Sequence, residues 1–115
     1  MKIKSLFKNV EYIGQAEGDR RTYYVFSGTD SYLVVAPNGR DGLNVNVVDA
    51  EVTQVISKRF AGQRVTGRRL KKEARRPDLF GRSFAPLNSL YVMVALERAR
   101  KLKAREGRAM VFRVK

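Results

Sequence analysis

The residues of this chain that could do chemistry are mostly arginines and lysines, and one run concentrates them. The segment from Gly67 to Arg76 reads GRRLKKEARR, with Leu70 and Ala74 as its small apolar face. At helical spacing four of its cations share one face and a fifth lies beside them: Arg68, Lys72, Arg75 and Arg76, then Arg69. Like charges at this spacing destabilise an isolated helix by a few tenths of a kcal/mol per pair, and phosphate groups would neutralise them. The run favours a polyanion-binding helix; a solvated, arginine-rich surface is the second interpretation.

The distribution of charge along the chain supports the same interpretation. The net charge is +13 over 115 residues. Residues 1–56 hold six Lys or Arg and seven Asp or Glu, a balance of −1, whereas residues 57–115 hold eighteen and four, a balance of +14. Charges of one sign concentrated in one half of a chain repel each other and destabilise the folded state. A polyanionic partner neutralises them and removes this repulsion. Nucleic acid is the partner we expect; an acidic protein, a membrane surface and simple solubility are the alternatives.

The residue types that are missing argue against an enzyme. The chain has no cysteine and no histidine, so it lacks disulfides, thiolate ligands and the commonest general base and metal ligand. Its eleven acidic residues are scattered, and no glycine-rich phosphate loop is present. We expect no catalytic residue, no cofactor and no metal site.

The chain shows no signal for a membrane or for export. No apolar run approaches the roughly 18 residues of a membrane span. The N-terminus, MKIKSLFKNVEYIG, lacks the long apolar region and the cleavage site of a secretory signal. The absence of cysteine fits the cytosol. We expect a cytoplasmic protein with no membrane partner.

The first half reads as an antiparallel meander of four strands over residues 7–48. Its candidate strands are rich in β-branched and aromatic residues: FKNVEYIG, RTYYVFSG, SYLVVAP and LNVNVV. Turn sequences separate them: QAEGDRR, Thr29-Asp30 and PNGRDG. The tyrosines of this β-module either form a small aromatic core or stack on bases of a single-stranded nucleic acid.

Three helices are expected after the meander. The first covers about residues 50–61, behind Asp49 as a possible cap. The second begins after Thr66, with Val65 and Leu70 as a hydrophobic staple, and ends at Pro77. The third begins at Pro86, or slightly later with Asn88 as its cap, and its apolar stripe consists of Leu87, Leu90, Tyr91, Val94 and Ala95.

The end of the third helix has two interpretations. The helix stops near Arg100 and LKARE pairs with RAMVFRV across Glu106, Gly107 and Arg108, or it continues to Glu106. We favour the hairpin, because AMVFRVK is strand-like and a strand needs a partner.

Further candidate contacts lie in and around the third helix. Four residues lie off its apolar stripe, where they could reach base edges or a thymine methyl group: Asn88, Ser89, Val92 and Met93. Alternatively, Asn88 only caps the helix and Met93 fills a gap in the core. The remaining candidates for phosphate contact are cations of the connection and the hairpin: Arg82, Arg98, Lys103, Arg105 and Arg108.

The segments VTGRRL, LNSLYVMVAL and LKAREGRAMVFRV resemble the second helix, the recognition helix and the wing of a winged-helix, or helix-turn-helix, DNA-binding domain. With the first helix the resemblance covers about residues 49–115. It implies that the second helix crosses the DNA backbone, that the third enters the major groove, and that the wing follows an adjacent groove or phosphate run.

The sequence therefore predicts an α+β fold, an N-terminal antiparallel β-meander packed on a three-helix winged-helix-like unit with a C-terminal β-hairpin. Residues 1–48 and 49–115 should form two subunits of one packed unit, because no linker separates them. We expect non-catalytic binding of duplex DNA. The alternatives are an RNA-binding or ribosome-associated factor and a protein-interaction adaptor that uses the β-module. That module could also be the interface of a homodimer or the docking site of a protein partner.

Overall fold

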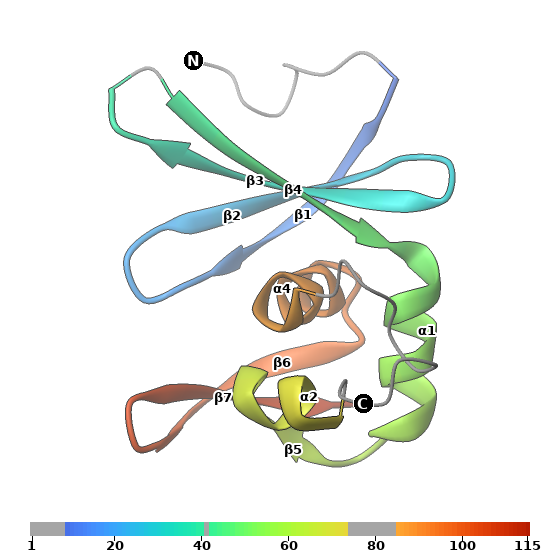
Figure 1. The fold of residues 1–115 in the computed structure, drawn as a ribbon, viewed down its shortest axis with the longest axis vertical. Helices are drawn as coiled ribbons and strands as arrows, with labels where there is room; N and C mark the ends of the chain where they lie inside the picture. The colour runs from blue at the N-terminus through green and yellow to red at the C-terminus, as the bar shows by residue number, and fades with distance from the viewer. Residues whose placement is uncertain (1–8, 41, 74–84) are drawn as a thin grey trace.

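The first half of the chain forms a four-stranded antiparallel sheet. In this computed structural model the described residues are 9–40, 42–73 and 85–115. The strands β1 (Glu11–Glu17), β2 (Thr22–Ser27), β3 (Ser31–Asn38) and β4 (Gly42–Asp49) lie in the order of the chain, as Figure 1 shows at the top of the view. The expected meander is confirmed.

One expected turn begins later than its sequence suggests. Residues 15–17 belong to β1 rather than to the turn, and they pair with residues 22–24 of β2. A shift of register at Gly14 precedes them and places Ala16 in the core, where it is 4% exposed. Burial of this alanine outweighs the polar, turn-like character of its neighbours.

Helix α1 (Ala50–Arg59) and helix α2 (Gly67–Glu73) follow the expected pattern. Asp49 stands at the N-cap position of α1, although its side chain makes no capping hydrogen bond. Thr66 does cap α2, because its hydroxyl oxygen accepts the backbone N–H of Arg69 at 3.2 Å. Both staple residues, Val65 and Leu70, are buried. The end expected for this helix at Arg76 and the connection that follows lie outside the described residues.

Helix α4 (Pro86–Ala95) starts at the expected proline and ends well before Glu106. At its end, the backbone N–H of Arg98 donates to the carbonyl of Met93 at 2.9 Å, and that of Glu97 donates to the carbonyl of Val94 at 3.0 Å. This pair of bonds is the Schellman motif, in which the residue after the cap has a positive φ. Glu97 takes that position with a φ of 60°.

The C-terminal hairpin favoured by the sequence is present. Strands β6 (Ala99–Glu106) and β7 (Ala109–Val114) pair antiparallel, and the short strand β5 (Arg64–Val65) pairs with the other edge of β7. In the described residues the fold is thus α+β, with two antiparallel sheets and three helices.

Helix α4 lies between the two sheets, and α1 runs along one side of the molecule (Figure 1). The ring of Tyr91 stacks on Tyr23 of β2, with centroids 4.2 Å apart, and meets the ring of Phe112 of β7 edge-on at 6.3 Å. Leu90, Val92 and Met93 of the same helix are 0% exposed. One core therefore extends from the meander through α4 to the second sheet.

None of the helices in the described ranges has both the length and the apolar character that crossing a bilayer requires.

Candidate nucleic-acid interface

Three arginines lie in register across the second sheet. Arg113 of β7 pairs with Arg64 of β5 on one side and with Arg100 of β6 on the other. All three residues are exposed. Directly opposed residues of an antiparallel pair have Cβ atoms about 4.5–5.5 Å apart, and like charges there are destabilising. We call Arg64, Arg113 and Arg100 the arginine row.

The alternation of the strands forces the row onto the outer face of the sheet. The neighbouring cross-strand set contains Val65 and Phe112, which are 1% and 0% exposed and belong to the core. Ala99 and Val114, which flank the row on its other side, are paired and buried as well. Because successive side chains of a strand point to opposite faces, the arginines between these residues point away from the core.

Arg69 of α2 supports the row instead of adding a free charge. Its guanidinium donates to the backbone carbonyl of Arg64 at 2.8 Å and to the side-chain oxygen of Gln63 at 2.7 Å. It also lies over the ring of Phe60, 5.4 Å from the centroid. Arg69 thereby fixes the strand that carries the first arginine of the row.

The other cations expected on the second helix are only partly described. Arg68 and Lys72 are exposed on α2, as is Lys71 beside them. Arg75, Arg76 and Arg82 lie outside the described residues.

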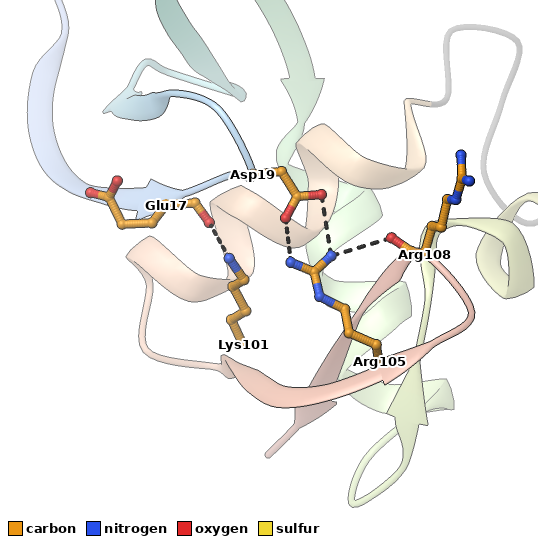
Figure 2. Close-up of polar contacts among 5 residues, drawn as sticks. All are labelled: Glu17, Asp19, Lys101, Arg105 and Arg108. Carbon is orange, nitrogen blue, oxygen red and sulfur yellow. Dashed lines mark hydrogen bonds and ion pairs between the residues drawn. The ribbon is translucent and has the colours of Figure 1, made fainter.

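Two cations of the hairpin bind the meander. The Lys101 ammonium group donates to the backbone carbonyl of Glu17 at 3.3 Å. The Arg105 guanidinium spans both carboxylate oxygens of Asp19, with one contact at 3.2 Å, and donates to the carbonyl of Arg108 at 3.2 Å. Figure 2 shows these groups joining the hairpin to the end of β1, at Glu17, and to the turn that follows, at Asp19.

The contact between Arg105 and Asp19 changes the titration of both groups. The hydrogen bond from Arg105 holds the pKa of the Asp19 carboxyl below its usual range. The same bond raises the pKa of Arg105. Arg105, a predicted phosphate contact, therefore has an intramolecular counter-ion. The other predicted cations of this region, Arg98, Lys103 and Arg108, are exposed.

The residues expected to read bases do not lie on a free helix face. Ser89 is 1% exposed and Val92 and Met93 are 0% exposed, so the prediction that these three residues lie off the apolar stripe is wrong. The Ser89 hydroxyl donates to the carbonyl of Ala85 at 2.8 Å, and the sulfur of Met93 accepts a long hydrogen bond from Ser57 at 3.8 Å. The physical reason is that α1 packs against α4 as well as the two sheets, so more than one face of the helix is covered.

Asn88 keeps partial access to solvent near the start of α4. It is not the helix cap, because Ala85 occupies that position and Pro86 follows it. The alternative in which Asn88 caps a later start is therefore wrong.

A groove of about 610 Å³ separates the start of α2 from the tip of the hairpin. Arg68 lines it from α2, and Glu106 and Arg108 line it from the hairpin. Two of the predicted phosphate contacts, Arg68 and Arg108, therefore line the same groove.

The arginine row is not apparent from the sequence. Each member stands beside core residues in a short strand-like stretch: Arg64 before Val65, Arg113 between Phe112 and Val114, and Arg100 after Ala99. That alternation marks each arginine as outward-facing, but it does not show that the three strands align them.

Comparison of the chain with protein-family models, with curated proteins and with solved structures gave no match.

Proposed function

We propose that this protein binds a nucleic-acid duplex, preferably DNA, without catalysis, and that it does so through the phosphate backbone. The arginine row is the observation that carries the proposal. Its three like charges lie opposite one another on neighbouring strands, which costs folding free energy unless an anion is bound. Arginine is well suited to phosphate, because its planar guanidinium can donate two parallel hydrogen bonds.

The surroundings of the row favour a duplex over a single strand. Single strands are usually held by aromatic side chains on which bases stack. Phe112 is the sole aromatic residue of β5, β6 and β7, and it is buried on the opposite face. Val111, which alternates onto the same side as Arg113, is aliphatic. The row thus offers charge without a stacking platform.

The burial of α4 changes the expected mode of recognition. The order of α1, β5, α2, α4, β6 and β7 supports the resemblance to a winged helix. In this chain, however, the meander covers the middle of the helix that would read bases. Phosphate contacts position a protein on nucleic acid, whereas base contacts specify a sequence. We therefore propose binding with little sequence preference, by a cytoplasmic protein.

The test is a salt titration of binding, followed by fluorescence anisotropy of a labelled DNA duplex. The variant replaces Arg64, Arg100 and Arg113 by glutamine. Removing one arginine that binds a phosphate lowers the log–log salt slope by about 0.9, so removing three lowers it by up to about 2.7. When salt rises from 50 to 200 mM, the wild type should therefore lose up to about 40-fold more affinity than the variant loses.

The matched control replaces three exposed cations elsewhere by glutamine: Arg20, Arg40 and Lys58. Its net charge equals that of the first variant, so it reports diffuse attraction alone. A fall in slope as large as that of the row variant would contradict a defined interface. Duplexes of unrelated sequence should bind with affinities within about threefold of one another.

Competition among duplex DNA, duplex RNA and single-stranded DNA decides the class of ligand. A tenfold preference for RNA would replace the DNA proposal by the RNA-binding alternative. If the protein binds none of the three, the nucleic-acid proposal is wrong and the protein-interaction adaptor becomes the favoured hypothesis.

A further inference from the structure

The free edge of β4 is the least protected surface of the meander. Val45 and Val47 are 46% and 55% exposed, and they are two of the three large apolar residues that are exposed in the described ranges. β3 pairs with one side of the strand over its whole length, from Gly42 to Asp49. In the described part of the chain, no strand pairs with the other side.

This edge also lacks the features that usually block the addition of another strand. Natural sheets protect their edges with charged residues, prolines and bulges. The stretch from Gly42 to Val48 reads GLNVNVV and contains neither a charge nor a proline, and its pairing with β3 shows no irregularity. Over residues 42–48 the edge of β4 is therefore regular and uncharged, and the exposed Asp49 at its end is the one charge of the strand.

The opposite edge of the same sheet, β1, is protected. It has a shift of register between Tyr12 and Gly14, and exposed glutamates stand at both its ends. At Gly14, a Cβ atom would lie 3.2 Å from the carbonyl oxygen of Ala95, so the middle of this strand lies against α4. Of the two edges of this sheet, only β4 combines a straight edge with exposed apolar side chains.

A hydrogen bond at the end of β4 fixes which of its residues direct their backbone groups toward the free edge. The backbone N–H of Ala50 donates to the carbonyl of Asp30 at 3.0 Å, which makes these two residues a hydrogen-bonded pair. Such pairs alternate along an antiparallel ladder. Residues 44, 46 and 48 therefore direct their backbone groups toward β3, while Leu43, Val45 and Val47 direct theirs toward the free edge.

We propose that β4 pairs antiparallel with β4 of a second copy of this chain, about a two-fold axis at Val45. In this register Val45 lies opposite its own copy and Leu43 lies opposite Val47. The three outward-facing residues of each strand then form about six backbone hydrogen bonds. Leucine and valine side chains meet on one face of the joined sheet and asparagines on the other, so residues 43–47 are complementary to themselves. Beyond them the register sets Asp49 opposite Asp41 of the second copy, and these like charges limit the ladder to the central residues.

Charge favours a second copy over an unlike partner at this edge. Two chains of net charge +13 repel each other, but residues 1–56 of each contribute only −1. Pairing through β4 joins these nearly neutral halves and leaves the sheet with the arginine row across α4 from the meander (Figure 1). An acidic partner would be attracted to that basic sheet and not to a strand whose one charge, Asp49, is negative. The proposal does not depend on nucleic-acid binding.

The first measurement is the mass of the nucleic-acid-free, full-length protein by sedimentation equilibrium at about 0.5 M salt, where charge repulsion is screened. We expect a monomer–dimer equilibrium. The Val45→Pro variant removes an outward N–H and leaves the ladder to β3 intact, as proline allows on an edge strand. Dimerisation should weaken at least tenfold, with unchanged far-ultraviolet circular dichroism.

Two further variants keep the test decisive if proline disturbs folding. Val45→Lys places like charges opposite each other across the axis, and it should also give a monomer. Gln15→Lys, on the exposed edge of β1, is the matched control and should dimerise as the wild type does.

The register is tested with Val45→Cys, because the chain has no cysteine of its own. Opposed residues of a hydrogen-bonded pair have Cα atoms about 5.5 Å apart, within the range of a disulfide. Mild oxidation should crosslink this variant and not Gln15→Cys. A wild type that stays monomeric at millimolar concentration, or a Val45→Pro variant that dimerises fully, would overturn the proposal.

Discussion

Shortening Met93 to alanine should destabilise the protein strongly and leave its affinity for nucleic acid unchanged. Met93 is 0% exposed in the last turn of α4, belongs to the core and contacts Ser57 of α1. Removing a fully buried methionine side chain costs about 2–5 kcal/mol, since it leaves a cavity that the surroundings fill only in part. Because the sequence alone suggests a base contact at this position, the substitution distinguishes a side chain that packs in the core from one that contacts bases.

The size of the effect can be converted into a melting temperature. Unfolding entropy near 60 °C is about 2.1 cal/mol/K per residue, which gives about 240 cal/mol/K for a chain of 115 residues. A loss of 2–5 kcal/mol then lowers Tm by about 8–20 °C. Thermal and urea unfolding, followed by circular dichroism, measure this shift. Binding is measured well below the lowered Tm, where the variant is folded.

Two observations together would contradict the burial of Met93. A Tm within about 2 °C of the wild type, together with a changed preference among base pairs, would place Met93 on an exposed reading face. Leu87→Ala on the same helix is the matched control, because Leu87 is 37% exposed. It should cost less than about 1 kcal/mol, given that large losses come from buried side chains.

Three further predictions concern single contacts. Gly14→Ala should cost about 1–3 kcal/mol in chemical denaturation, because the added Cβ lies 3.2 Å from the carbonyl oxygen of Ala95 and the φ of 155° is unfavourable for alanine; an unchanged denaturation midpoint would contradict the close packing of β1 on α4. Glu97→Gly should stabilise by about 0.5–1 kcal/mol, since glycine favours the positive φ found there, and a lower Tm would contradict this. Because Arg105 lowers the pKa of Asp19, this carboxyl stabilises the folded protein above its ordinary pKa, and the contribution is lost as the pH falls through the lowered value. The stability advantage of the wild type over Asp19→Asn should therefore be present at pH 7 and vanish on acidification below about pH 4; an advantage that persists in acid would show that the ion pair is not its source.

The parts of the fold that could be predicted from the sequence are those determined by local patterns. Period-2 alternation and the Asn38-Gly39 turn define the meander, and Thr66 defines the start of α2 through a hydrogen bond within one turn. The C-terminal hairpin follows from two short β-rich stretches joined at Gly107, whose φ is 61°. Each of these signals lies within a few residues of the element that it specifies.

The errors concern features that depend on distant parts of the chain. The stripe expected on α4 assumes one buried face, whereas the two sheets and α1 enclose the helix on several sides and cover Ser89, Val92 and Met93. A helix that is apolar on most sides, such as LNSLYVMVAL, is typical of a fully buried position, and this signal is present in the sequence. The arginine row could not be predicted, because it needs the register of strands 49 residues apart in the chain, at Arg64 and Arg113.

The position of α4 also has a consequence for folding. Tyr91 contacts Tyr23, which precedes it by 68 residues, and Phe112, which follows it by 21. Neither the meander nor the second sheet encloses a complete core without this helix, so neither half gains its full burial energy until the other has docked. The barrier to folding therefore includes closure of a long loop, and the two sheets should lose their amide protection against hydrogen exchange together in one cooperative unit.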